Sequence, residues 1–199
     1  KRDKLFLFGN YEGFRQSLAA TSVSVVPDLQ ARQGSLPNAQ GVYTPVQNLN
    51  RSVLPFFALW PAPNGPPLEV NGVPTGAALS YNNPKQSIRE DFGTVRGDYT
   101  ISQHDSFSTI YTINNGFSLQ PVADPLFASR TNLVTQVASI EQTHVFSPRM
   151  LNVFRAGLSR AAYNFDSSAI TPFPPGLDFV TGAGPGGIII GGAIASTGP

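Results

Sequence analysis

Residues 92–114 read FGTVRGDYTISQHDSFSTIYTIN, and this stretch decides the fold that the sequence predicts. It consists of two arms around a polar turn at residues 102–105, and small or apolar residues recur at alternate positions. That set is Gly93, Val95, Gly97, Tyr99 and Ile101 on the first arm, and Phe107, Tyr111 and Ile113 on the second. Polar residues fill most positions between them, with Ile110 as an interruption. This pattern is typical of half-buried antiparallel strands. Arms of about ten residues suit a tilted bilayer crossing, so we expect the apolar face to meet lipid and the polar face a watery lumen.

The composition permits this interpretation. Charged residues make up 13% of the 199 residues, about half the usual share of a soluble domain. The net charge of +1 and the lack of any Lys/Arg run indicate no surface for nucleic acid. The absence of cysteine excludes disulfides and thiolate metal sites. No apolar run reaches eighteen residues, so we expect no transmembrane helix.

Proline placement delimits the remaining strands, because proline removes a donor from the hydrogen-bond ladder. We expect five strands, near residues 4–15, 88–102, 106–114, 133–146 and 151–165. They should form hairpins over 88–114 and 133–165, with 4–15 beside 88–102. Arg160 falls on an apolar face, where its head group would have to reach the membrane edge. The segment 4–15 alone is equally consistent with a buried strand of a soluble sandwich.

The connections between these strands alternate in length. Short turns are expected at 103–105 and 147–150, and long loops at 16–87, 115–131 and 166–199. Short turns on one side and long loops on the other are typical of a bacterial outer-membrane barrel. The fold class we expect is therefore all-β: an antiparallel meander of about five strands, forming part of a transmembrane β-barrel with long extracellular loops.

The first long loop contains the features most open to interpretation. Val23–Val26 is a candidate short strand, and Val53–Trp60 a short helix. Phe56, Phe57 and Trp60 either contact a ligand at the barrel mouth or form the loop's own apolar cluster, and the cluster is favoured.

Several segments resemble one receptor family, in the same order along the chain. Asp3–Arg15, DKLFLFGNYEGFR, is similar to the DKxFFFGNYEGFR segment of the large Oar-like TonB-dependent receptors of acidobacteria. Ala58–Gly65 resembles their LxPxPN loop, and Phe92–Asp105 their GRxDxxxxxxD strand and turn. Ser147–Ser159 resembles NEFRxGxSR, and Ile188–Gly192 resembles ITIxG.

This resemblance implies an outer-membrane barrel of about 22 strands around a plug, energised through TonB. Residues 1–199 would then be an internal fragment with about five strands from the early part of the barrel. The family's N-terminal domain, plug and TonB box are not in this sequence. The implied partners are outer-membrane lipid, the TonB system through the missing plug region, and an imported ligand of unknown identity; the implied location is the cell outer membrane.

Patterns for catalysis and cofactors are weak. Gly182–Gly187 matches GxGxxG, but a poor helix start follows it and no acidic ribose partner appears, so a flexible loop is favoured. His104 and His144 lack metal-ligand spacing. Glu90 and Asp91 are adjacent, which directs their carboxylates to opposite faces of a strand. We therefore predict no catalytic, cofactor-binding or metal-binding residues, no cofactor and no enzyme.

Arg96, Asp98 and Arg155 either line a polar pathway or pair with neighbours, and pairing is favoured. Three functions stay open at this point. The first is part of an outer-membrane receptor that binds and imports a ligand, recognised in loops 16–87 and 115–131. The second is an Oar-like outer-membrane protein with an adhesive or secretion-related role. The third is a soluble all-β binding module, for instance for carbohydrate.

Overall fold

The computed structural model describes residues 3–191 and 194–198 and divides into two compact units. Unit 1 contains residues 3–16, Ser87–Ser118 and Thr131–Phe165. Unit 2 contains Ser17–Gln86, Leu119–Arg130, 166–191 and 194–198. The helices within these described residues are all too short or too polar to cross a membrane.

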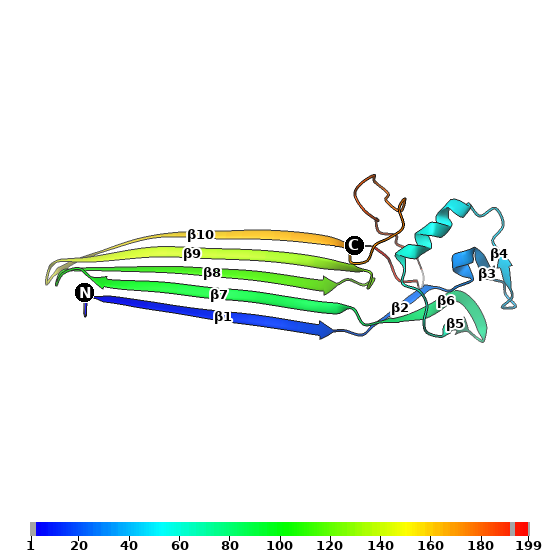
Figure 1. The fold of residues 1–199 in the computed structure, drawn as a ribbon, viewed down its shortest axis with the longest axis horizontal. Helices are drawn as coiled ribbons and strands as arrows, with labels where there is room; N and C mark the ends of the chain where they lie inside the picture. The colour runs from blue at the N-terminus through cyan, green and yellow to red at the C-terminus, as the bar shows by residue number, and fades with distance from the viewer. Residues whose placement is uncertain (1–2, 192–193, 199) are drawn as a thin grey trace. The chain divides into compact units, whose positions relative to one another are not determined.

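Five long strands pair in the order β1-β7-β8-β9-β10, and neighbouring arrows run in opposite directions (Figure 1). Their bounds are β1 Leu5–Ala19, β7 Lys85–Thr100, β8 Asp105–Pro121, β9 Phe127–Ser147 and β10 Met150–Ala169. The all-β antiparallel fold class is confirmed. The strand order also places the first strand beside the first arm of the hairpin, as the sequence predicts.

The turn of the hairpin is closed by a serine side chain. Ser102 Oγ accepts hydrogen bonds from the amides of His104 and Asp105, both at 3.0 Å. The Ile101 amide donates to Asp105 O at 2.9 Å. Because these bonds begin at Ile101, β7 ends at Thr100, two residues before the predicted end at 102.

The strands after this turn are longer than predicted. β8 continues to Pro121 instead of 114, and β9 begins at Phe127 instead of 133, so the loop expected over 115–131 shrinks to 122–126. Asn115-Gly116, which reads as a turn signal, lies inside β8. A Cβ on Gly116 would stand 3.7 Å from Leu133 O of β9. Pairing with a neighbouring strand thus overrides the local turn preference.

The first long connection is not the irregular loop expected over 16–87. It contains a second antiparallel sheet of order β2-β6-β5, a small hairpin of β3 and β4, and two 3₁₀ helices. The bounds are β2 Ser22–Pro27, η1 Ala31–Gln33, β3 Ser35–Pro37, β4 Tyr43–Pro45, η2 Arg51–Leu59, β5 Pro67–Val70 and β6 Val73–Asn82. The valines of β2 pair with β6, for example Val25 with Leu79 and Val26 with Ala78. Sequence patterning missed β6 because small residues and a glycine hide its alternation.

The short helix expected over 53–60 is present as η2. The Asn50 side chain accepts from the Ser52 amide at 3.1 Å and so caps its start. The chain leaves η2 directly into Trp60, which is 3% exposed.

Unit 2 has its own core, drawn from three of its segments. It is formed by Val26, Leu59, Trp60, Phe127 and Leu177, with Phe56 and Phe57 among the residues packed against it. The aromatic residues of the first loop therefore lie in an apolar cluster, as favoured, but the cluster is not the loop's own, because Phe127 and Leu177 come from outside the loop.

The segment expected as a third loop, 166–199, is anchored to this core. Trp60 Nε1 donates to Ala195 O at 2.8 Å. Ile188 and Thr197 exchange backbone hydrogen bonds of 2.8 and 3.0 Å. Gly192, which ends the stretch similar to ITIxG, lies outside the described residues, as do 193 and 199.

A buried group of three hydrogen-bonding residues also anchors this segment. Thr197 Oγ1 lies 2.5 Å from Leu59 O and within hydrogen-bond distance of Asp124 Oδ2. One hydroxyl hydrogen serves only one of these acceptors. The Thr197 hydroxyl therefore donates to one of the two at a time. Burial raises the pKa of Asp124, whereas the hydrogen bonds from Thr197 and the Leu126 amide lower it.

Candidate functional site

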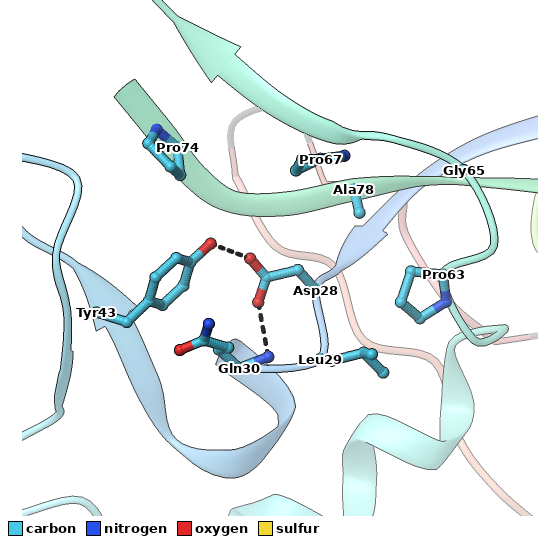
Figure 2. A pocket seen from close by; sticks show the side chains of 9 residues that line it. All are labelled: Asp28, Leu29, Gln30, Tyr43, Pro63, Gly65, Pro67, Pro74 and Ala78. Carbon is cyan, nitrogen blue, oxygen red and sulfur yellow. Dashed lines mark hydrogen bonds between the residues drawn. The ribbon is translucent and has the colours of Figure 1, made fainter. Parts of the chain in front are cut away.

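Unit 2 contains a pocket of about 330 Å³ around Asp28 (Figure 2). Asp28 follows directly after β2 and is 8% exposed. Its Oδ1 accepts hydrogen bonds from the amides of Gln30 at 3.0 Å and Ala31 at 2.7 Å. This local turn, common for aspartate, starts η1, and Gly34 in the left-handed region ends it. The carboxylate is thus fixed by the backbone that follows it.

The second polar group of the pocket is the phenol of Tyr43. Its hydroxyl donates to Asp28 Oδ2, as Figure 2 shows. The ring is positioned by the small hairpin, in which Tyr43 pairs with Pro37. Burial, followed by the bond to Asp28, raises the pKa of Tyr43 to about 12. The phenol therefore stays neutral and acts as a donor to the carboxylate.

The remaining walls are largely apolar and come from the turn after β2, the chain between η2 and β5, the start of β5, and β6. They consist of Leu29, Pro63, Gly65, Pro67, Pro74 and Ala78. Proline rings are rigid and carry no N–H, so this part of the lining offers hydrocarbon surface in a fixed shape.

The proline-rich segment is tied to β6 by side-chain hydrogen bonds. Asn64 Nδ2 donates to Tyr81 O at 2.8 Å, and its Oδ1 accepts from the Tyr81 amide at 2.7 Å. Ser80 Oγ donates to Ala62 O at 2.9 Å. Gly65 packs so closely that a Cβ would stand 2.4 Å from the Tyr81 ring and 2.9 Å from Leu79 Cβ. These contacts hold the wall in place.

The nearby cation Arg32 is committed to structure. Its guanidinium donates to four backbone carbonyls: Pro27, Phe57, Trp60 and Pro61. Burial lowers the pKa of Arg32, but an arginine stays charged at neutral pH. Arg32 thus joins η1 to the end of η2 and does not line the pocket, so Asp28 supplies the only formal charge among the residues that do.

Comparison with known proteins identifies the chain's family. The family described as "Outer membrane beta barrel domain" matches residues 1–196. The chain belongs to this family. It is an outer-membrane protein, and its long strands are barrel strands. Neither the curated proteins nor the solved structures contain a match.

Membership in an outer-membrane barrel family gives the two faces of the unit 1 sheet distinct solvents. The apolar face of the sheet is exposed. The exposed fraction is 60% for Val95, 73% for Leu158 and 41% for Tyr111. Within the described residues no second layer seals them. The opposite face carries Thr94 and Thr112, whose hydroxyls lie 3.1 Å apart across β7 and β8.

The polar side chains singled out in the sequence form pairs on this second face. Arg96 donates two hydrogen bonds of 2.8 Å to Asp98. Arg155 of β10 donates to Glu141 of β9 at 2.5 Å. The preference for pairing over an open polar pathway is confirmed for these residues.

The weak catalytic patterns fall at separate places. His144 Nδ1 lies 2.5 Å from Asp105 Oδ1, at the start of β8. Gly182–Gly187 lies where Asp178 bridges Pro185, with Gly182 and Gly184 in the left-handed region. Among residues 3–191 and 194–198, His, Asp and Glu side chains form no group of three that could hold a metal.

Sequence reasoning missed the pocket residues. The segment WPAPNGPP overlaps the stretch Ala58–Gly65 that resembles a loop of the receptor family, but no pattern in it predicts a pocket wall. The one available signal was a polar residue, Asp28, directly after a valine-rich strand that ends in proline. Tyr43 carries no comparable signal, because its partner lies fifteen residues away.

Proposed function

We propose that this chain is part of a TonB-dependent receptor that binds a ligand outside the cell and imports it. The observation that carries the proposal is that the long connections have a defined structure. They fold into a unit with its own core and a fixed pocket, instead of remaining independent loops. A receptor needs such preorganised recognition surfaces, because ordering flexible loops on binding would cost affinity.

Strand connectivity supports an external position for this unit. The connections at 101–104 and 148–149 are short, whereas 20–84 and the chain after Ala169 are long. Both long segments, and the five-residue connection 122–126, belong to unit 2. In bacterial outer-membrane barrels the short turns are periplasmic and the longer loops extracellular. By this rule unit 2 faces the medium, where a ligand is captured.

The resemblance of Asp3–Arg15 and the later segments to Oar-like receptors supplies the link to TonB. The proposed partners are outer-membrane lipid, the TonB system through a plug outside this sequence, and an imported ligand. Binding and transport are proposed without catalysis.

The test uses the full-length gene product, purified from outer membranes in detergent. It is mixed with the periplasmic domain of TonB from the same organism, and an unrelated porin from the same membrane serves as control. Co-elution with the TonB domain, absent for the porin, is the expected result. Absence of co-elution would contradict import and would favour the adhesion or secretion role instead.

A further inference from the structure

We infer that the Asp28 pocket binds a small, neutral, hydroxyl-bearing ring such as one or two units of a saccharide. This inference rests on the proposed function, because it names the ligand class that the receptor would capture. It is carried by the pocket's free hydrogen-bonding capacity, its walls and its rigidity.

The Asp28 carboxylate keeps free acceptor capacity. A carboxylate has about four lone-pair positions. Asp28 uses three of them, for the amides of Gln30 and Ala31 and for the Tyr43 hydroxyl. One acceptor position on a charged oxygen is left over, and a single hydroxyl hydrogen satisfies it with a charge-assisted bond.

The pocket lining carries a single formal charge. Asp28 is the only ionised residue among those that line the pocket, and Arg32 is directed to carbonyl groups. An anionic ligand would place its charge beside Asp28 without a cation to compensate it. A cationic ligand meets a carboxylate whose charge is already shared by three donors. A neutral donor therefore suits the site best.

The walls of the pocket are largely hydrocarbon. Pro63, Pro67 and Pro74 present rigid hydrocarbon rings, and Leu29 and Ala78 add aliphatic surface. The C–H faces of a sugar ring match such surfaces, while its hydroxyl edge matches Asp28 and the Gln30 side chain. The volume of about 330 Å³ is near the lower end for small-molecule pockets, which restricts the ligand to a small one.

The pocket is preorganised by hydrogen bonds within the protein. Both polar groups are held by bonds that exist without ligand, and Asn64 fixes the proline-rich wall to β6. Binding then requires little ordering of the protein, so even a weakly polar ligand retains most of its interaction free energy.

The experiment measures binding to full-length protein in detergent by saturation-transfer NMR and calorimetry. The probes are glucose, xylose, arabinose, maltose and cellobiose as neutral ligands, glucuronic acid as the anion and glucosamine as the cation. We expect at least one neutral probe to bind, and to bind more tightly than both charged probes.

Two variants locate the site. Asp28→Asn keeps an acceptor for the backbone turn but removes the charged oxygen, and should weaken binding at least tenfold. Leu29→Trp fills the pocket from a side chain that is 63% exposed, so it should abolish binding without disturbing the core. Asp178→Asn changes an exposed carboxylate of unit 2 outside the pocket and serves as the matched control.

Each outcome decides the inference. Binding that is lost in Leu29→Trp, weakened in Asp28→Asn and kept in Asp178→Asn supports it. No binding of any neutral probe, preference for a charged probe, or binding unaffected by Leu29→Trp overturns it. Co-elution with TonB is independent of these results, so failure of the ligand class is distinguishable from failure of the receptor function.

Discussion

Val95 offers a direct test of which solvent the two faces of the barrel sheet meet. It lies on β7, is 60% exposed, and belongs to the face assigned to lipid. Its neighbour Thr94 points to the opposite face, where its hydroxyl lies 3.1 Å from that of Thr112. We predict that Val95→Arg strongly destabilises the assembled barrel, whereas Thr94→Arg has a small effect.

The magnitude follows from the depth of the residue. Val95 is five residues from Thr100, the end of β7 at the short turn. At about 3.3 Å per residue and a tilt of about 45°, it lies roughly 12 Å inside the membrane, half-way across an apolar band about 25 Å tall. Arginine on the lipid face at the midplane costs about 2–4 kcal/mol. Thr94→Arg loses one neutral hydrogen bond, about 1 kcal/mol, and its charge stays in water.

The assay is folding of the full-length protein into phosphatidylcholine vesicles across a urea series, followed by the mobility shift of the folded barrel on gels. Val95→Leu controls for side-chain size. Val95→Cys and Thr94→Cys, made in the full-length protein with any other cysteine replaced, provide a second measurement with spin labels, where oxygen should reach the first label and a nickel chelate the second. Equal costs for the two arginine variants, or reversed label accessibility, would refute the assignment of the faces.

Three further predictions concern unit 2, and local opening measured by hydrogen exchange on the full-length protein checks each. The raised pKa of Asp124 means that its stabilising contribution is complete below the unfolded pKa, about 3.9, and is lost as pH rises through the folded pKa. Asp124→Asn keeps an oxygen that accepts from Thr197 and has no titrating proton, so it should remove this decline. Arg32→Lys replaces a planar fork on four carbonyls by a point charge and should cost about 2 kcal/mol, so unchanged exchange near η1 would contradict its assigned role. Trp60→Phe removes the bond to Ala195 O and should lower protection of that segment by about 1 kcal/mol, with no change expected in the β7–β8 turn.

The parts of the fold that the sequence predicted are those in which the chain meets two different solvents. The apolar and polar alternation over 92–114 predicted β7, the turn and the first half of β8, because each side chain there is selected for one solvent. Ser102, followed by His104 and Asp105, marked the turn through a side chain that bonds amides two and three residues ahead. Local chemistry of this kind is visible in a single sequence.

The pocket was not predictable in the same way, because its contacts join distant residues. Asp28 meets Tyr43, and Arg32 meets carbonyls as far away as Pro61. Neither residue of such a pair lies in a sequence pattern that predicts the other. Thr197 and Leu59 are even further apart in the chain, and only the folded unit brings them together.

Five predicted strand ends, at 15, 88, 114, 133 and 165, fall short of the observed ones and carry information about the membrane. β8, β9 and β10 have 17, 21 and 20 residues, whereas a tilted strand crosses a bilayer in about 9–11. Lipid imposes alternation only on the crossing part, so a prediction from alternation stops where the lipid does. The predicted ends at 15, 88, 114, 133 and 165 lie within a few residues of the division between the two units, at 16, 87, 118, 131 and 165. Contact density and residue patterning thus change near the same residues of each strand. The strand ends beyond that level belong to unit 2, and they are selected for the packing of that unit instead of for contact with lipid.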